Sequence, residues 1–124
     1  MGEESLHKEL TERIIGAAME VHRELRNGLD EKLYENALCI EFAIQGIHFE
    51  QQKRFTVFYK QRPLGNLIPD LIVDHAVIVD TKVVECFNDA HISQMIGYLK
   101  ITGLRVALLL NFKHASLQIK RITI

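Results

Sequence analysis

Three charged residues stand inside an otherwise apolar stretch in the middle of the chain. The segment "LIPDLIVDHAVIVDTKVVE", residues 67–85, has the pattern of two apolar strands joined by a turn, and it contains Asp70, Asp80 and Lys82. A hydrophobic core needs none of these charges, and burying one without a partner costs several kcal/mol. The residue types therefore point to chemistry rather than to packing.

The turn between the two strands decides whether these charges can act together. Side chains alternate between the faces of a strand, so Asp80 and Lys82 share one face. A two-residue loop would place Asp70 opposite Val79, whereas a three-residue loop, residues 74–76, would place it opposite Asp80. We predict a turn of odd length, with all three charges converging on one face.

Two carboxylates and a lysine in this arrangement suit a particular reaction. Residues directly opposite each other are about 4.5–5.5 Å apart at Cβ, so two carboxylates there repel unless a divalent metal or a shared proton relieves them. An ammonium beside them favours deprotonation of an attacking water and offsets the charge of a pentacovalent phosphate. The pattern indicates metal-assisted phosphodiester hydrolysis. On spacing alone, an ion pair on an exposed sheet face explains it equally well.

Composition bounds the class of protein. The chain has 124 residues, 48% of them hydrophobic and 25% charged, which fits one globular domain, residues 1–124, that folds alone as a monomer or a small oligomer such as a homodimer. No segment has the length of apolar run that spans a membrane, and the acidic, polar start "MGEESLHKEL" is unlike a signal peptide. We therefore expect a cytoplasmic protein that does not contact a membrane.

The cysteines and the net charge exclude further classes. Cys39 and Cys86 have neither metal-ligand spacing nor the density of a disulfide scaffold, so we expect reduced, structural thiols. With 15 basic and 16 acidic residues the net charge is −1, which gives no global attraction to nucleic acid. A nuclease remains compatible with this balance if scattered basic residues form a positive rim around the site. The alternative is that these residues are simply solvated on the surface. The candidates are Lys53, Arg54, Lys60, Arg62, Lys100 and Arg105.

Hydrophobic periodicity predicts three helices. The first runs from Ser5 to about Arg26 and is ended by "NG"; the second begins near Asp30 and ends at Gly46; the third spans about residues 89–102. The second helix is expected to bury four apolar residues at helical spacing: Leu33, Ala37, Ile40 and Ile44.

Between and after these helices the apolar pattern predicts strands. We expect strands within residues 47–53 and 55–60, a turn at "QRPLG", residues 61–65, and then the hairpin described above. Two further strands, "LRVALLLNF" and "LQIKRITI", close the chain. This order predicts one α/β or α+β domain with a mixed sheet.

Three blocks of the sequence resemble a known family. "PD", followed by a hairpin and "DTK", resembles the PD-(D/E)xK motif of the restriction-endonuclease-like nucleases. "GLDEKLY", residues 28–34, resembles the motif that names the small prokaryotic GxxExxY proteins, which are assigned to that superfamily. The longer segments "IIGAAMEVHRELRNGLDEKLYENAL", "IPDLIVDHAVIVDTKVVE" and "QMIGYLKITGLRVALLLNF" resemble its successive blocks in the right order.

The resemblance implies a restriction-endonuclease-like α/β fold, a mixed central sheet flanked by helices, and Mg²⁺- or Mn²⁺-dependent hydrolysis of DNA. In this reading Asp70 and Asp80 are the metal-binding carboxylates and Lys82 is the catalytic lysine. Glu31 is a further acidic ligand or orients water, although a glutamate in the first turn of a helix also stabilises the helix dipole.

Gln94 and Tyr98 resemble the QxxxY element of the RecB-like branch of the superfamily, which implies that they line the site and contact substrate. Their spacing of four puts them on one helical face. The structural alternative is an amphipathic helix that packs Tyr98 with its hydroxyl outward.

The sequence also departs from the family. Asp80 stands where glutamate is usual and reaches one methylene less, and Arg26, Asn27 and Gly28 replace a glycine-proline-glycine turn. His22 and Tyr34 match family positions, but we interpret them as structural residues. We predict a metal-dependent DNA nuclease. The alternatives are a catalytically weak or inactive nuclease fold that binds nucleic acid or a partner protein, and an assembly module that contacts no nucleic acid.

Overall fold

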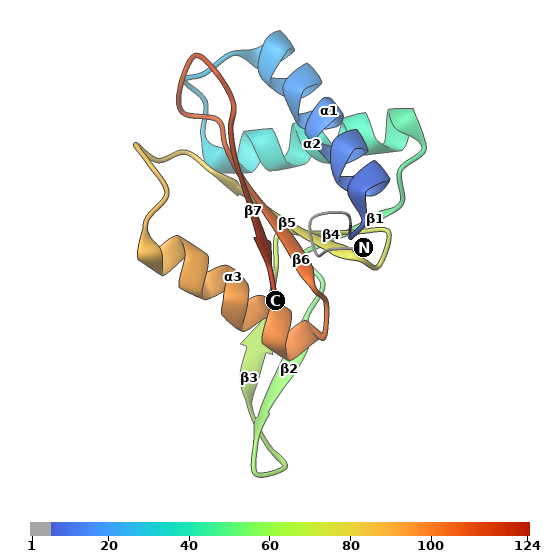
Figure 1. Cartoon of the computed structure of the whole chain (residues 1–124), viewed down its shortest axis with the longest axis vertical. Helices are drawn as coiled ribbons and strands as arrows, with labels where there is room; N and C mark the ends of the chain where they lie inside the picture. The colour runs from blue at the N-terminus through green and yellow to red at the C-terminus, as the bar shows by residue number, and fades with distance from the viewer. Residues whose placement is uncertain (1–5) are drawn as a thin grey trace.

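The computed structural model describes residues 6–124. The chain forms three helices and seven strands within this range (Figure 1). In chain order they are α1 (Lys8–Leu25), α2 (Glu31–Gln45), β1 (Phe49–Gln51), β2 (Phe55–Tyr59), β3 (Arg62–Leu67), β4 (Leu71–Val73), β5 (Val77–Lys82), α3 (Asp89–Thr102), β6 (Val106–Asn111) and β7 (Gln118–Thr123).

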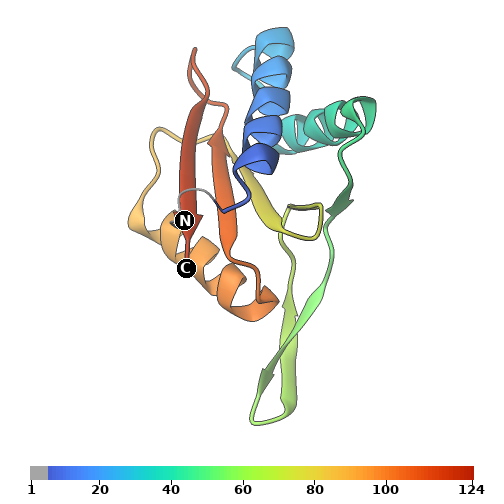
Figure 2. The ribbon, with the colours of Figure 1, turned by 45° about the vertical axis from the view of Figure 1, so that its right-hand side comes forward.

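Five of the strands form a mixed central sheet in the order β1-β4-β5-β6-β7. The β5–β6 pair is parallel and the other pairs are antiparallel, so α3 serves as the crossover between two parallel strands. Strands β2 and β3 form a separate two-stranded sheet that extends away from the rest of the molecule (Figure 2).

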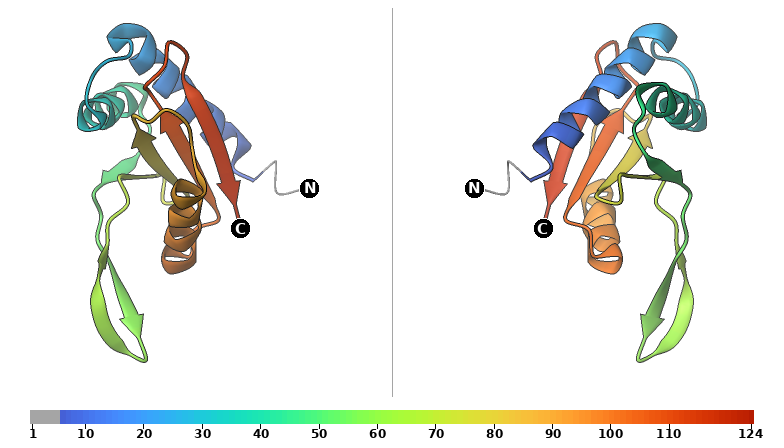
Figure 3. Two further views of the ribbon diagram at one scale, coloured as in Figure 1. Left: turned by 90° about the vertical axis from the view of Figure 1, so that its left-hand side faces the viewer. Right: turned by 90° about the vertical axis from the view of Figure 1, so that its right-hand side faces the viewer.

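Helices cover both faces of the central sheet (Figure 3). On one face α1 and α2 pack against alternate strand residues such as Leu71, Val77 and Val79. On the other face α3 packs, through Met95 and Leu99, against strand residues that include Ile78. Because β5 and β6 are covered on both sides, they can be almost continuously apolar, and all six residues of β6 are buried.

The predicted helices are confirmed with small changes at their ends. Ser5, the predicted start of the first helix, lies outside the described residues, and α1 ends one residue before Arg26, whose N–H donates to His22 O at 2.8 Å. Asp30 precedes α2 as predicted but its side chain makes no capping hydrogen bond, and the left-handed Gly46 ends the helix. The third helix has the predicted bounds.

The predicted buried face of the second helix is wrong. Leu33, Ile40 and Ile44 are 50%, 64% and 72% exposed. The side of α2 that packs inward instead carries Tyr34, Glu35, Leu38, Cys39 and Phe42. The helix has two apolar stripes, and the one with the two large aromatic rings fills the core, because larger side chains bury more apolar area.

The predicted turn at residues 61–65 is also wrong. Tyr59 pairs with Arg62, so the chain reverses at Lys60 and Gln61, which both have left-handed backbone with φ of 47° and 68°. Two consecutive positive φ values are what a tight two-residue hairpin requires. The residues "RPLGNL" then continue as β3, where proline is tolerated because each strand of this sheet has a free edge.

The two cysteines differ in their surroundings. Cys39 is buried and free, and burial raises the pKa of its thiol to about 11. Cys86 is free but exposed, so it does not share the packing role that was predicted for both. Among the helices of the described residues, none has the length and apolar character needed to cross a membrane.

Candidate active site

The β4–β5 hairpin has the predicted three-residue loop. Leu71 pairs with Val79 and Val73 with Val77, which leaves residues 74–76 as the turn. The next position in this register brings Asp70, just before β4, level with Asp80 on β5. The loop length thus sets the two carboxylates opposite each other.

Asp70 is held by the neighbouring strand. Its Oδ2 accepts hydrogen bonds from the backbone N–H of Thr81 at 3.2 Å and from Thr81 Oγ1 at 3.4 Å. The carboxylate serves as acceptor here because β4 begins only at Leu71, so the edge of β5 that faces β4 has no strand partner at Thr81, while its other edge pairs with β6. Burial, followed by the charge of Asp80, raises the pKa of Asp70 to about 7. The two carboxyl groups are close enough to share that proton.

Asp80 and Lys82 form a close ion pair. Lys82 Nζ lies 2.5 Å from Asp80 Oδ2, and Asp80 is only 4% exposed. Burial by itself would lower the pKa of the Lys82 ammonium, but contact with Asp80 and the charge of that carboxylate outweigh it, so the pKa is raised. Asp80 Oδ2 accepts no well-directed hydrogen bond in spite of its burial. A buried carboxylate oxygen in this state has capacity for a further ligand.

The start of α2 adds more acidic groups. Glu31 accepts a hydrogen bond from the backbone N–H of Val83, next to Lys82; burial raises the pKa of Glu31, and the Lys82 charge partly opposes this. Glu35 lies one helical turn further on, is buried, and its charge contributes to the raised pKa of Asp70. Sequence reasoning missed Glu35, although its spacing of four from Glu31 places both on one helical face.

Several hydrogen-bond donors compensate the cost of burying the Glu35 carboxylate. Its Oε2 accepts from Lys32 Nζ at 2.9 Å, from Gln51 Nε2 at 2.7 Å and from Gln52 Nε2 at 3.0 Å. Gln52 also donates its backbone N–H to Asp70 O at 2.9 Å. Through Gln51 and Gln52, Glu35 connects α2 to the end of β1. Because Gln52 also donates to Asp70 O, the same contacts link Glu35 to the first aspartate of the candidate site.

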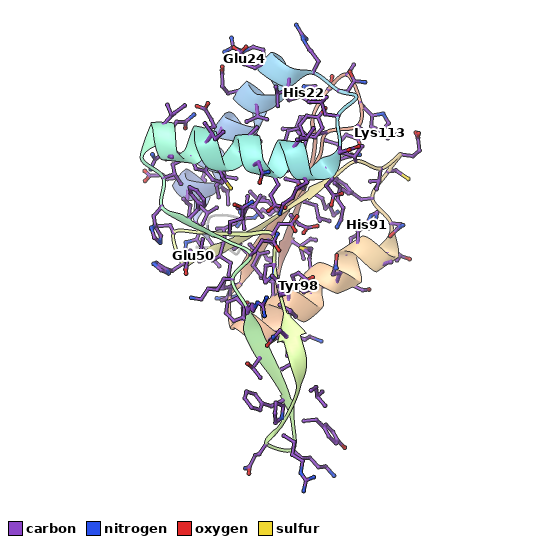
Figure 4. The ribbon with its side chains drawn as sticks, turned by 180° about the vertical axis from the view of Figure 1, so that it is seen from behind. His22, Glu24, Glu50, His91, Tyr98 and Lys113 are labelled. Atoms are coloured by element: carbon purple, nitrogen blue, oxygen red, sulfur yellow. The ribbon has the colours of Figure 1, made fainter. Side chains whose placement is uncertain are left out.

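The third helix supplies polar side chains from the opposite direction. Tyr98 lies on α3 (Figure 4) and packs partly against the same apolar cluster as Ile78, on the sheet face that also carries Asp80. Burial and then the charges of Asp80 and Asp70 raise the pKa of its phenol. Gln94 Nε2 donates to Tyr98 Oη at 3.2 Å. Both side chains therefore lie on the same side of the sheet as Lys82.

Two residues interpreted as structural are buried and hydrogen-bonded, as predicted. Tyr34 donates to Arg26 O at 2.5 Å, accepts from the Leu29 N–H at 3.2 Å, and stacks on Phe112 with ring centroids 4.5 Å apart. His22 Nε2 lies 2.8 Å from His114 O. Tyr34 thus anchors the loop between α1 and α2 that leads directly to Glu31.

Asn111 fixes the backbone that follows Lys82. Its amide donates to Val84 O at 2.7 Å and accepts from Val84 N at 3.1 Å, and the side chain is fully buried. It lies beside Lys82 in the parallel β5–β6 ladder. Sequence analysis did not single it out, because only the pairing of β5 with β6 brings these residues together.

A second group of potential metal ligands lies at the turn end of the hairpin. Within residues 6–124, the ligand atoms of His48, Glu50 and His75 all lie within 4.8 Å of one another. Glu50 lies at the β1 edge of the sheet in Figure 4. The turn is roughly 13 Å from Asp70 along β4, at about 3.3 Å per residue, so this group is separate from the predicted site.

The donor set around Asp70 and Asp80 fits a hard divalent cation. Mg²⁺ and Mn²⁺ prefer carboxylate oxygens, and this end of the hairpin brings Asp70 level with Asp80, while the charges of Glu31 and Glu35 act on Lys82 and Asp70. The crowding of the two carboxylates, which together with burial raises the pKa of Asp70 to about 7, is a feature that a bound cation would relieve.

A mixed sheet with helices on both faces, and with two aspartates and a lysine meeting at the end of a strand, is a restriction-endonuclease-like arrangement. The chain matches the model of the PD-(D/E)XK nuclease superfamily over residues 8–122, and it belongs to that superfamily. No curated protein and no solved structure matches it significantly. The fold prediction is confirmed, while membership of the narrower GxxExxY group stays a prediction.

Proposed function

We propose that the protein is a cytoplasmic nuclease that hydrolyses DNA phosphodiester bonds with Mg²⁺ or Mn²⁺. The observation that carries the proposal is the juxtaposition of Asp70 and Asp80, together with the Lys82 ammonium 2.5 Å from Asp80. Crowding two carboxylates destabilises a fold, and carboxylates perturbed in this way are concentrated at sites where a cation or a substrate binds them. Membership of a nuclease superfamily supports the same reading.

In this proposal Asp70 and Asp80 hold the cation, and Glu31 contributes a further oxygen or orients water. When bound, the cation would supply Lewis-acid activation of water and of the phosphate. Asp70 must give up its proton for this role, and because burial and Asp80 raise the pKa of Asp70 to about 7, the deprotonated form is available from neutral pH upward.

Lys82 acts on the phosphate. Its raised pKa keeps the ammonium charged, and its contact with Asp80 aims the charge at the carboxylate pair. There it would stabilise the negative charge that builds up on the phosphate in the transition state. Gln94 and Tyr98, linked to each other on α3, would contact the DNA strand from the other side of the site.

A cleavage assay tests the proposal. Supercoiled plasmid and a single-stranded oligonucleotide are incubated with wild type, Lys82→Ala and Lys113→Ala in Mg²⁺, Mn²⁺ or EDTA. Lys113 is a matched control because it is also a lysine paired with a carboxylate, Glu85, at 3.5 Å. We expect cutting that needs metal, falls at least ~100-fold in Lys82→Ala and persists in Lys113→Ala. Cutting that survives in Lys82→Ala would overturn the assignment.

A second function is favoured by two observations. Asp80 replaces the usual glutamate and is already paired with Lys82, and α2 leaves the large apolar side chains Leu33, Ile40 and Ile44 in solvent. A nuclease fold that has lost activity and binds nucleic acid or a protein partner accounts for both. Salt-dependent DNA binding without any cutting would favour it. Sedimentation of wild type against Ile44→Glu would show whether a second copy, as in a homodimer, covers this face.

A further inference from the structure

The two-stranded sheet of β2 and β3 has an unusual charge distribution for this chain. Residues 53–67, which we call the arm, contain four basic residues and no acidic one: Lys53, Arg54, Lys60 and Arg62. The whole chain has 15 basic and 16 acidic residues, so the remainder carries 11 and 16. A near-neutral total therefore conceals a positive arm on a negative body.

The arm also exposes large apolar side chains. Phe58 and Tyr59 are each 61% exposed and Leu64 is 67% exposed, while only residues at the base, such as Phe55, pack partly against the body. Lys60 Nζ lies 5.4 Å from the centroid of the Tyr59 ring. Water-exposed rings beside cations suit a ligand that offers both negative charge and apolar contacts, as the phosphates and the thymine methyl groups of a DNA major groove do.

The shape of the arm fits the same ligand. Figures 1 and 2 show it projecting from the body without a helix or strand over either face. A two-stranded antiparallel ribbon is narrow enough to enter the major groove of duplex DNA, which is about 12 Å wide. With six residues, β3 is about 20 Å long at ~3.3 Å per residue, enough to cross that groove.

The base of the arm is fixed to the candidate active site. β3 ends at Leu67, three residues before Asp70, and Gln52, just before the arm begins, donates its backbone N–H to Asp70 O at 2.9 Å. The short connection from Leu67 to Asp70 and the hydrogen bond from Gln52 to Asp70 therefore hold the base of the arm beside the first aspartate of the candidate site. We propose that the arm binds duplex DNA, with Lys60 and Arg62 on the phosphates and the exposed ring of Tyr59 against the groove, next to the strand to be cut.

This inference rests on the proposed function for its ligand, but binding tests it without cleavage. Fluorescence anisotropy with a ~30-base-pair duplex would compare Lys82→Ala with Lys82→Ala carrying Lys60→Asn and Arg62→Gln. Asparagine suits the left-handed backbone of Lys60. Lys8→Gln with Lys120→Gln is the matched control, since it removes two exposed positive charges outside the arm.

We expect the arm variant to bind at least ~10-fold more weakly at 0.1 M salt, with a salt slope reduced by about 2, while the control changes less than twofold. Tyr59→Ser should weaken binding several-fold and leave the salt slope unchanged, because it removes an apolar contact but no charge. Equal binding by the arm variant and the control would overturn the inference.

The two proposals can fail separately. If wild type cuts DNA, and the arm substitutions leave binding unchanged in Lys82→Ala and cutting unchanged when made in wild type, the arm assignment is wrong and the nuclease stands. If wild type never cuts but binding depends on the arm, the nuclease is wrong and the arm stands. Vesicles of anionic lipid serve as the competing ligand: binding to vesicles that needs the arm, with DNA binding unaffected, would assign the arm to a membrane surface and overturn the DNA reading.

Discussion

Two groups of ionisable side chains, one near each end of the β4–β5 hairpin, lie in different surroundings. At the open end, Asp70 and Asp80 meet under Lys82, and Asp80 is 4% exposed. At the turn end, Glu50 lies 3.4 Å from His75 Nδ1 and 3.5 Å from Lys53 Nζ. There the side chain of His75 is 66% exposed and that of Glu50 32%.

The difference shows that ligand types alone do not make a strong cation site. At the turn end each oxygen of Glu50 already faces a cationic or hydrogen-bonding partner, and water screens the group. At the open end the two carboxylates are crowded in a buried space, which raises the pKa of Asp70 to about 7. Binding of a cation or a proton there relieves the repulsion between them. The open end should therefore control metal binding and catalysis, and the turn end should not.

The largest expected effect concerns cleavage. Asp70→Asn should reduce metal-dependent cutting of DNA at least ~100-fold, because it removes one of the two carboxylates proposed to hold the cation. Glu50→Gln makes the same chemical change at the turn end and should stay within twofold of wild type. Initial rates on plasmid in Mg²⁺ measure both, and a comparable loss in the two variants would break the comparison.

Metal-induced stabilisation should follow the same division. Thermal melts of wild type should shift upward in Mn²⁺, in proportion to RT ln(1 + [L]/Kd), about 2.7 kcal/mol at a hundredfold excess over Kd. Asp80→Asn should lose most of this shift, whereas His75→Asn, which suits the left-handed backbone at that position, should retain it. If His75→Asn abolishes the shift instead, the cation binds at the turn end.

The open end should also give the metal-free protein a distinctive dependence on pH. Because the pKa of Asp70 is raised to about 7, the folded chain keeps a proton that the unfolded chain releases near pH 4. Its contribution to the free energy of unfolding is therefore present below about pH 4 and lost as the pH rises to about 7.

Asp70→Asn replaces the titrating carboxyl with a neutral amide, so the buried negative charge that destabilises wild type at pH 8 is absent. The metal-free variant should therefore be more stable than wild type at pH 8 by about 1–3 kcal/mol, after allowing for partial solvation, and the difference should be smaller at pH 5. Urea denaturation in EDTA at the two pH values measures the effect. A variant less stable than wild type at pH 8 would show that Asp70 is a purely structural acceptor for Thr81.

The smallest effect expected comes from the loop that supports the open end. Tyr34→Phe deletes the hydroxyl that joins Arg26 O to the Leu29 N–H and should cost about 1–2 kcal/mol of unfolding free energy. Since this loop leads to Glu31, cleavage should fall by several-fold as well. Denaturation and plasmid assays measure the two effects, and an unchanged cleavage rate would argue against a role for Glu31.

The register of the site could be predicted from sequence because it depends on local rules. Alternation along a strand left two registers, one for each loop length, and the odd loop predicted from the chemistry of the three charges is the one that places Asp70 opposite Asp80. The third helix was equally predictable, since its apolar spacing and the glycine after it agree. Each of these features is decided by residues close together in the chain.

Features set by distant contacts could not be predicted. The buried face of α2 depends on which of two apolar stripes meets the sheet. The residues "RPLG" have the composition of a turn although they form part of β3, because the chain already reverses at Lys60 and Gln61. The group of His48, Glu50 and His75 arises only because β1 pairs with β4, and the Asn111 contact only because β5 pairs with β6.

The parallel pairing of β5 with β6 has a consequence for how the protein is made. On the ribosome the chain can form α1, α2 and the β4–β5 hairpin from neighbouring segments, but Val77 finds its partner Val106 only after α3 has been synthesised. Pairings between distant segments form slowly. Asp80 and Lys82 therefore gain their final framework only after β6 has been made, and a chain that stops before β6 would hold the acidic residues without the sheet that positions them.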